Sequence, residues 1–186
     1  MLQITMVSLW KKISGKIFLK SRGLTLYKDK VIAPNKEKRE YYYVRISRGV
    51  VVIPIDKKGN VYLQKEYRYP KKSWNIEAIG GGIKPNQTSR QAAKEELLEE
   101  AGIKAKKLTK IGTTTVMPGH FDTRTTGFLA TNLSFHKTKH EKTELIKPLK
   151  MPLKKAIQLA LEGKINNAET VTFLLRAAEK IKQLKK

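Results

Sequence analysis

Short runs of β-branched and aromatic residues fill the first third of the chain and predict β-strands. Breakers such as Gly23 and the Pro34-Asn35 pair separate three such runs, which are Ile17–Leu19, Leu24–Lys28 and Tyr41–Ile46. Two further runs, Gly49–Ile55 and Val61–Tyr67, flank the turn sequence Asp56–Asn60. A strand, a glycine-containing turn and a second strand in this order predict a β-hairpin.

The hydrophobic period changes from strand to helix after a cluster of three glycines. Asn75–Ile79 predicts a strand, and Gly80–Gly82 follow it with backbone that can adopt conformations closed to other residues. Thr88 then stands three residues before Gln91, which is the spacing of a capping box, and Gly102 is a typical helix end. We therefore expect a helix between Thr88 and Gly102.

The last third of the chain continues with two predicted strands and two predicted helices. The strands are Lys110–Val116 and Gly127–Leu133, and the helices are Leu153–Glu162 and Ala168–Leu184, with a break at Gly163. The last helix has an apolar stripe made by Val171, Leu174, Leu175, Ala178 and Ile181. The order of elements predicts an α/β fold in which helices pack on a sheet.

Length and composition limit the class of protein. With 186 residues, 40% of them hydrophobic and 30% charged, the chain fits one folded domain with a terminal extension rather than a disordered polymer. The absence of cysteine excludes disulfides, thiolate metal sites and cysteine nucleophiles. The first residues lack the layout of a signal peptide and no apolar run reaches membrane-spanning length, so we expect a cytoplasmic protein with no membrane partner.

The formal net charge of +23 favours polyanionic or phosphorylated ligands. Most of this charge comes from lysines scattered along the whole chain, and clusters occur only at Lys104–Lys107, Lys137–Lys142 and Lys182–Lys186. None of the clusters has the interleaved aromatic residues of a single-strand binding platform. A solvated lysine-rich surface is thus the favoured interpretation, and nucleic-acid binding is the alternative.

Four of the 16 acidic residues, Glu95, Glu96, Glu99 and Glu100, stand within six positions of the predicted helix. Residues four apart share a helix face, so two like-charge pairs arise, each destabilising by about 0.2–0.5 kcal/mol. Lysines offset such repulsion, and a hard divalent cation bound by carboxylate oxygens offsets it better. The alternative is an ordinary solvated acidic face.

The segment Gly81–Ile103 resembles the Nudix box, a glycine, loop and helix motif with acidic residues at fixed spacing. The matching positions are Gly81, Glu96, Leu97, Glu99, Glu100, Gly102 and Ile103. This resemblance implies a Nudix-type α/β/α sandwich with a mixed sheet and an N-terminal β extension. It also implies Mg²⁺ or Mn²⁺ held by Glu96 and Glu100, with Glu99 supporting the site and the Gly80 carbonyl as a further ligand.

Two positions depart from the box. Gln87 stands where the family usually has glutamate, and Glu95 stands where it has arginine. The arginine of the family pairs with and orients a catalytic glutamate, so its replacement by an anion disturbs orientation or, alternatively, tightens cation binding. The neighbouring Lys94 points about 100° away around a helix and is a poor substitute.

The resemblance extends over residues 10–177 and is greatest to the ADP-ribose pyrophosphatase branch. The segments that carry it are Glu66–Pro70, Trp74, Asn75–Glu77, Met117–Asp122, Phe128–Ala130 and Gly163–Ala168. It implies metal-dependent hydrolysis of ADP-ribose, or a related nucleoside diphosphate-sugar, to a nucleoside monophosphate and a sugar phosphate. One alternative is a Nudix hydrolase for another diphosphate, such as a dinucleotide or a flavin nucleotide. The other is a catalytically weak Nudix-fold protein that binds RNA or another polyanion.

The same branch implies substrate-binding residues on the central strands and loops. Arg68 and Glu77 fall where the family places substrate-contacting or supporting residues, and arginine suits phosphate because its planar fork donates two hydrogen bonds. Trp74 and Phe121 are candidates for stacking on adenine. Burial in the core is the alternative for both aromatic residues.

The branch also implies a catalytic carboxylate on an acidic loop before the C-terminal helices. Glu144 is the candidate for holding the attacking water or a further metal ion, and Glu141 is the reserve. His120 is a second candidate base, or a loop histidine bonded to backbone. Residues 1–48 resemble the dimerisation extension of the branch and residues 49–186 its hydrolase domain, so we expect a homodimer.

Overall fold

A computed structural model describes residues 9–138 and 145–184, and these residues form two compact units. The first unit contains the described residues up to 47 together with residues 117–123. The second unit contains the described residues of 48–116 and 124–186. Nothing in the sequence indicates that residues 117–123 belong with the N-terminal strands.

The first unit is a four-stranded sheet in the order β1-β2-β3-β9. Its strands are β1 (Lys11–Ser21), β2 (Leu24–Ile32), β3 (Lys38–Ile46) and β9 (Phe121–Asp122). The first three strands are antiparallel neighbours and are longer than the apolar runs that predicted them, whereas β9 pairs with β3 in parallel. Every residue of β1 is exposed.

The second unit contains a mixed sheet and a smaller antiparallel sheet. The order of the mixed sheet is β7 (Ile79–Gly82), β4 (Gly49–Pro54), β10 (Thr125–Phe135) and β8 (Ile103–Thr114). The order of the smaller sheet is β11 (Ile146–Pro152), β5 (Asn60–Arg68) and β6 (Ser73–Glu77), with a short 3₁₀ turn at Tyr69–Lys71. In the mixed sheet β10 runs parallel to β4 and antiparallel to β8.

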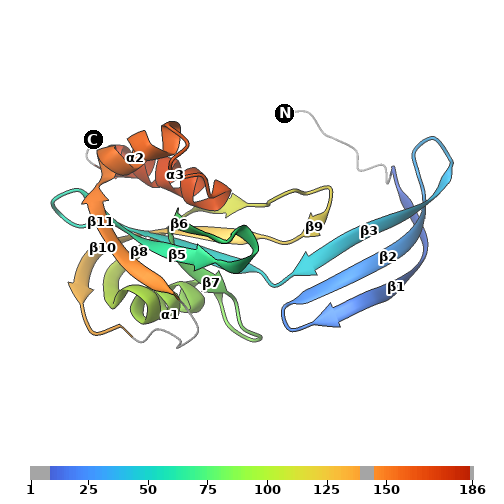
Figure 1. The fold of residues 1–186 in the computed structure, drawn as a ribbon, viewed down its shortest axis with the longest axis horizontal. Helices are drawn as coiled ribbons and strands as arrows, with labels where there is room; N and C mark the ends of the chain where they lie inside the picture. Colours follow the sequence, from blue (N-terminus) through green and yellow to red (C-terminus); the bar gives the residue numbers. More distant parts are fainter. Residues whose placement is uncertain (1–8, 139–144, 185–186) are drawn as a thin grey trace. The chain divides into compact units, whose positions relative to one another are not determined.

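Three helices cover the strands of the second unit from both sides. Figure 1 shows α1 (Ser89–Ala101) on one side, and α2 (Leu153–Leu161) with α3 (Ala168–Leu184) on the opposite side. This layering confirms the predicted Nudix-type α/β/α sandwich. None of these helices, within the residues described, is both long and apolar enough to cross a bilayer.

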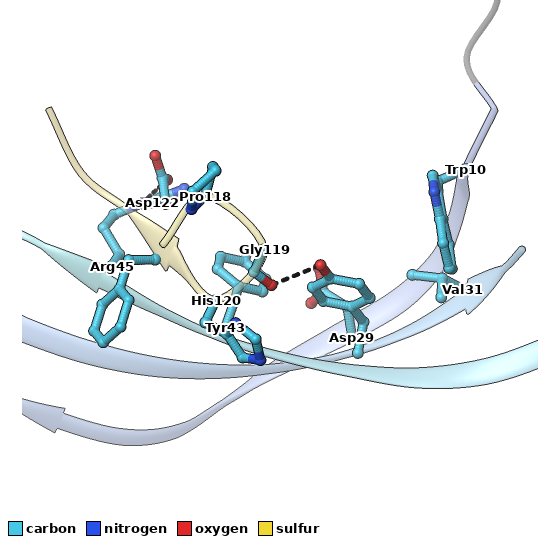
Figure 2. Close-up of a pocket in the computed structure, with 11 residues that line it drawn as sticks. Trp10, Asp29, Val31, Tyr43, Arg45, Pro118, Gly119, His120 and Asp122 are labelled. Atoms are coloured by element: carbon cyan, nitrogen blue, oxygen red, sulfur yellow. Dashed lines mark hydrogen bonds and ion pairs between the residues drawn. The ribbon is translucent and has the colours of Figure 1, made fainter. Parts of the chain in front are cut away.

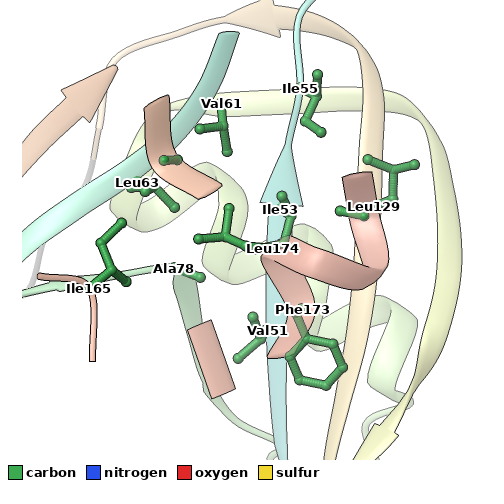
Figure 3. Close-up of a cluster of buried hydrophobic side chains, with 12 residues drawn as sticks. Val51, Ile53, Ile55, Val61, Leu63, Ala78, Leu129, Ile165, Phe173 and Leu174 are labelled. Atoms are coloured by element: carbon green, nitrogen blue, oxygen red, sulfur yellow. The ribbon is translucent and has the colours of Figure 1, made fainter. Parts of the chain in front are cut away.

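The alternating side chains of β4 serve both layers of the core. Val50 and Val52 belong to the buried cluster that includes Leu97 of α1, whereas Val51 and Ile53 belong to the cluster beneath α3. Figure 3 shows this second cluster, whose members on α3 include the ring of Phe173. Because β4 is buried on both faces, its sequence reads as a continuous apolar run rather than an alternating one.

The predicted hairpin of β4 and β5 is wrong, although its turn is correct. Asp56 Oδ1 accepts hydrogen bonds from the backbone N–H groups of Lys58 and Asn60, at 2.9 and 2.8 Å, and these close the turn. Beyond one bridge between Ile55 and Val61, however, the two strands separate into different sheets. Strand β4 pairs instead with β7 and β10, and β5 pairs with β6 directly after it and with the distant β11. The distant partners cannot be predicted from a local pattern.

The helix predictions are largely confirmed. Thr88 and Gln91 form the complete capping box of α1, and Gly102 ends this helix with a left-handed φ of 62°. The bounds of α3 are also as predicted, and its stripe is correct except at one position: Leu174 and Ala178 are buried, and Val171 and Ile181 pack against the same core. Leu175 is exposed and Phe173 is fully buried instead, because the missing side chain of Gly127 makes room for the Phe173 ring.

Strand β11 was not predicted, because Pro148 and Pro152 lie within it. Both prolines are tolerated since β11 is the edge strand of its sheet and pairs only with β5. The segment after residue 145 is therefore regular structure rather than loop.

Candidate active site around helix α1

Helix α1 places two glutamates over strand β7. Its buried residues include Ala92, Ala93 and Leu97, and this apolar contact fixes the rotation of the helix on the mixed sheet. Glu96 and Glu100 are four residues apart and therefore lie one above the other. Glu100 is only 8% exposed, which is rare for a glutamate that is not engaged by partners.

Glu100 is held by a strand on either side of it. Its Oε2 accepts a hydrogen bond from the backbone N–H of Gly80 at 3.0 Å and another from Nε2 of Gln64 at 3.2 Å. The sequence assigned the carbonyl of Gly80 to a metal, and the structure shows that its N–H already orients one of the predicted ligands. Gln64 was not predicted to belong to the site.

Glu96 lies directly against Gly81. A β-carbon at position 81 would be 2.3 Å from Oε1 of Glu96, which is far below the contact distance of two atoms. Glycine at position 81 therefore leaves the space that this carboxylate occupies, and a larger residue would displace the Glu96 side chain from it. Glu96, Glu100, Gly80 and Gly81 are thus brought together as the sequence predicted.

A row of polar side chains continues from Glu100 along one face of β5. Gln64, Glu66 and Arg68 alternate along the strand and share this face, and Glu77 on β6 stands opposite Gln64 in the register. Nε2 of Gln64 also donates to Glu66 at 3.4 Å, and Arg68 Nη1 is 2.6 Å from Glu66 Oε1. Gln64 and Glu66 were not predicted to belong to the site, although their period-two spacing with Arg68 was a usable signal.

Arg68 forms a two-pronged ion pair with Glu77. Its Nε and Nη2 donate to the two carboxylate oxygens at 3.2 and 2.8 Å. Although partial burial opposes the charge of the guanidinium, Glu77 and Glu66 raise the pKa of Arg68. Both Glu66 and Glu77 are buried, so Arg68 is the cation that compensates them. The two predicted substrate-binding residues are therefore bound to each other.

Glu95 faces the loop before the helix. Its Oε1 is 2.5 Å from Nζ of Lys84, and its Oε2 accepts a hydrogen bond from Nε2 of Gln87. Lys84 and then Gln87 lower the pKa of Glu95. Hydrogen bonding to Glu95 raises the pKa of Lys84, and the charges of Glu99 and Glu96 add to the effect. The cation that the crowded helix requires is supplied in part by Lys84, which the sequence analysis did not identify.

The oxygen donors of α1 fit a hard divalent ion, but not as a cage of three carboxylates. Within residues 9–138 and 145–184, no three acidic or histidine side chains converge into such a cluster. Mg²⁺ typically takes one or two carboxylates and fills the remaining positions with water and substrate phosphate. Glu96 and Glu100 meet that need beside β7, and Oε1 of Gln64 is a buried acceptor without a hydrogen bond in the described residues.

Trp74 lies on β6 with much of its ring in solvent. The side chain is 44% exposed, contacts Tyr67 edge to face at 5.9 Å, and has Nζ of Lys147 4.6 Å from its ring centre. This exposure contradicts the alternative of core packing. It leaves an aromatic face beside a cation, a combination suited to stacking on a planar anionic ligand.

Phe121 lies in the first unit and lines a pocket of about 340 Å³. Figure 2 shows the loop of Pro118, Gly119 and His120 above the strand that carries Tyr43. The loop is fixed because the hydroxyl of Tyr41 donates to the carbonyl of Gly119 at 2.7 Å. The other aromatic lining residues are Trp10, Tyr41 and Tyr43.

Two predicted residues are not placed. Glu144 and its reserve Glu141 lie outside the described residues. His120 is described, and its main chain is bonded at both ends: its N–H donates to Met117 and its carbonyl accepts from Val44, each at 2.8 Å.

Comparison with known proteins gives a consistent family. The model of the NUDIX domain matches residues 45–172, which is more than half of the chain. The chain is 28% identical to the ADP-ribose pyrophosphatase of Bacillus subtilis (strain 168) over 162 residues, covering 86% of this chain and 88% of the relative. It is 25% identical to the ADP compounds hydrolase NudE of Escherichia coli (strain K12), covering 72% of each chain.

A third relative has a different kind of substrate in its name. It is the CMP-5'-(N-acetyl-N-hydroxy-3-aminopropyl)phosphonate hydrolase of Streptomyces rubellomurinus (strain ATCC 31215), which is 24% identical over 89% of this chain and 81% of its own length. Among solved structures, a crystal structure of an ADP compounds hydrolase superposes with a TM-score of 0.82 at 22% identity. It covers 94% of this chain and 95% of its own. At that identity the likeness establishes the fold.

Proposed function

Because this chain belongs to the NUDIX domain family and is a pyrophosphohydrolase, we propose that it hydrolyses the diphosphate of ADP-ribose or a related nucleoside diphosphate-sugar. The products are a nucleoside monophosphate and a sugar phosphate. The observation that carries the proposal is the pair of glutamates, Glu96 and Glu100, held over the glycines of β7. The names of two relatives, which refer to ADP-ribose and ADP compounds, favour this substrate class.

The cofactor in this proposal is Mg²⁺ or Mn²⁺. Glu96 and Glu100 would hold it, with the carbonyl of Gly80 as a further ligand and Glu99 as a supporting acid on α1 outside the ligand set. When bound, such an ion neutralises the diphosphate and lowers the pKa of a bound water. The carboxylate of Glu100 is oriented for this role by Gly80 and Gln64, since both donate to its Oε2.

The protein has three tasks in this reaction. It must orient the diphosphate, position one water molecule for attack on phosphorus, and accept the proton that this water loses as the bridging P–O bond breaks. We assign proton acceptance to Glu144, with Glu141 in reserve, and Glu99 is a further candidate on α1. A carboxylate is suited to this task because its ionised form accepts a proton from a water molecule within hydrogen-bond reach.

Substrate recognition is assigned to the predicted aromatic and polar residues. Trp74 offers an exposed ring beside Lys147 for stacking on a base or ribose. Phe121 is the second stacking candidate. Arg68 and Glu77 contribute as a fixed ion pair, in which the exposed part of the guanidinium remains available to a phosphate oxygen.

The first unit is proposed to form a homodimer. Its outer strand β1 exposes Ile13, Ile17, Phe18 and Leu19, and it forms an edge of its sheet. Edge strands with exposed apolar side chains are sites of association. A closed two-fold dimer would cover both copies of this surface.

A substrate comparison tests the proposed activity. The purified protein is incubated with ADP-ribose at several Mg²⁺ and Mn²⁺ concentrations, and AMP and ribose phosphate are quantified by chromatography. A dinucleotide, a flavin nucleotide and a CMP-linked phosphonate are compared at equal concentration, since relatives differ in their named substrates. Faster turnover of one of these would move the substrate assignment to it. No hydrolysis with any metal, together with salt-dependent retention of RNA, would replace the enzyme by a polyanion-binding protein.

A further inference from the structure

Three side chains connect the loop before α1 to the helix itself. The amide oxygen of Gln87 accepts a hydrogen bond from the backbone N–H of Lys84 at 3.0 Å, and the amide nitrogen of Gln87 donates to Oε2 of Glu95. Nζ of Lys84 pairs with the other oxygen of Glu95 at 2.5 Å. We call Lys84, Gln87 and Glu95 the loop clasp.

Gln87 and Glu95, the two residues that depart from the box, are hydrogen-bonded to each other in the loop clasp. Gln87 must both accept from the loop and donate to the helix, and an ionised glutamate can only accept. Glu95 supplies the acceptor that the amide of Gln87 requires. The box usually has an acceptor, glutamate, at the first of these positions and a donor, arginine, at the second, whereas in this chain position 87 donates and position 95 accepts.

The ammonium group of Lys84 also reduces the repulsion on α1. It lies beside Glu95, and the charges of Glu99 and Glu96 act on it as well. Glu95 and Glu99 are four apart on the helix, where like charges are destabilising. A cation from the loop therefore offsets part of the repulsion on this side of the helix.

Loop and helix together determine where Glu96 points. Glu96 is adjacent to Glu95 in the chain, and its carboxylate packs on Gly81, three residues before Lys84. A loop that moved relative to α1 would change the distance between Gly81 and Glu96. All three clasp residues lie between Gly81 and Glu96 in the sequence, so the clasp holds together the segment whose two ends meet in this contact.

We propose that Lys84, Gln87 and Glu95 are positioning residues that fix the Glu96 carboxylate against β7, and that Glu95 itself is not a metal ligand. The inference rests on the proposed function only where turnover is measured. It differs from both earlier interpretations of Glu95, namely a defect in the box and an added ligand.

A charge-exchange cycle tests the proposal. Glu95→Arg places a guanidinium against the ammonium of Lys84 and the donor side of Gln87, and Gln87→Glu places a carboxylate against Glu95. Each single variant is expected to lose about tenfold in kcat at fixed Mg²⁺, the lower end of the effects seen for supporting residues of metal sites. The double variant Gln87→Glu, Glu95→Arg is expected to return to within about threefold of the parent, because Glu at 87 still accepts from the Lys84 N–H and pairs with Arg at 95.

The matched control is Glu179→Arg, which makes the same charge change on an exposed residue of α3. It is expected to leave both turnover and loop dynamics unchanged. A loss of turnover in the control equal to that of Glu95→Arg would show a general effect of added charge and overturn the proposal.

A second readout does not depend on catalysis. Amide hydrogen exchange at Lys84 and Gln87 should accelerate in both single variants and return towards the parent in the double variant, because both amides are bonded within the loop. Binding of Mn²⁺ followed by paramagnetic resonance should weaken in the single variants and recover in the double. If the parent protein hydrolyses none of the substrates, the proposed function fails, and exchange and Mn²⁺ binding still decide the proposal.

Three further results would overturn the proposal. Glu95→Arg that raises turnover would identify Glu95 as a defect of the box. If Glu95→Arg weakens Mn²⁺ binding but leaves amide hydrogen exchange in the loop unchanged, Glu95 is a metal ligand. If the double variant loses as much turnover as the two single losses combined, Gln87 and Glu95 do not act together.

Discussion

The carboxylate of Glu96 lies close to the α-carbon of Gly81. A methyl group added to Gly81 would be 2.3 Å from Oε1 of Glu96. The neighbouring glycines differ in this respect. A β-carbon at Gly80 would be 2.2 Å from the carbonyl oxygen of Val50, which is backbone, and one at Gly82 would have no neighbour within 4 Å. Gly80 and Gly81 therefore have different steric reasons to remain glycine, and Gly82 has none.

Gly81→Ala is expected to reduce turnover at least about tenfold with little loss of stability, because the flexible Glu96 side chain can move aside but then leaves its position. Gly80→Ala should instead destabilise the fold by about 1–3 kcal/mol, since the backbone of β4 has to shift. Gly82→Ala is the control and should resemble the parent. Kinetics and urea unfolding of the three variants measure this, and equal effects at all three positions would contradict the assignment.

Glu96→Gln and Glu100→Gln are each expected to lose at least about 100-fold in turnover, because each replaces an anionic oxygen donor by a neutral amide. Circular dichroism should show an unchanged fold. Glu179→Gln on α3 is the control for loss of one negative charge. Turnover within about threefold of the parent at saturating Mg²⁺ would remove the residue from the metal site.

Arg68→Ala should destabilise the protein by about 2 kcal/mol, because it leaves the buried carboxylates of Glu66 and Glu77 without their cation. The figure is below that of a fully buried pair because the Arg68 side chain is 45% exposed. Arg68→Lys keeps the charge but loses the two-pronged geometry, so its free energy of unfolding should lie between those of the parent and Arg68→Ala. Urea unfolding tests the series. An Arg68→Ala protein as stable as the parent, with only a raised KM, would assign Arg68 to substrate contact alone.

Asp56→Asn should lower stability at pH 7 by about 2 kcal/mol. Burial would raise the pKa of Asp56, but hydrogen bonds from Asn60, Tyr62 and Lys58 outweigh it and lower this pKa to about 2. A pKa below the unfolded value means that the stabilisation is complete above about pH 4 and is lost as the pH falls towards 2. The difference between parent and variant should therefore shrink in that window. A difference independent of pH would contradict this role of Asp56.

The protein is expected to be a dimer at micromolar concentration, and light scattering measures its mass. Phe18→Lys with Leu19→Lys should shift it to the monomer, because both side chains are exposed apolar groups of β1. Lys11→Glu on the same strand is a control that changes charge without removing apolar surface. A monomer mass for the unaltered protein at high micromolar concentration would remove the dimer from the proposal.

Sequence motifs predicted those features of the fold that depend on residues a few positions apart. The capping box of Thr88 and Gln91 and the left-handed Gly102 fixed both ends of α1, because each depends on residues within four positions of it. The turn at Asp56 was likewise correct. The pairing of β4 with β10, more than 70 positions away, was not predictable in this way, and the hairpin prediction failed for that reason.

The same distinction holds for the candidate site. The spacing along α1 was sufficient to predict that Glu96 and Glu100 lie together, since one helix carries both. Gln64 reaches Glu100 across 36 positions, and Lys84 reaches Glu95 from the preceding loop, so neither contact follows from helical or strand period. Arg68 was assigned to phosphate because of its chemistry, and the buried acids beside it became apparent only from the sheet register.

The pairing of β9 with β3 gives the first unit a discontinuous sequence. The chain passes between the two units at three places, residues 47–48, 116–117 and 123–124, so a cut after residue 47 would not release an intact first unit. During synthesis on the ribosome, β1, β2 and β3 emerge first, and their sheet stays incomplete until Phe121 and Asp122 have been translated. The exposed apolar side chains of β1 are synthesised before the second unit, so in the proposed dimer the surface for subunit pairing is available before either copy of the second unit has folded.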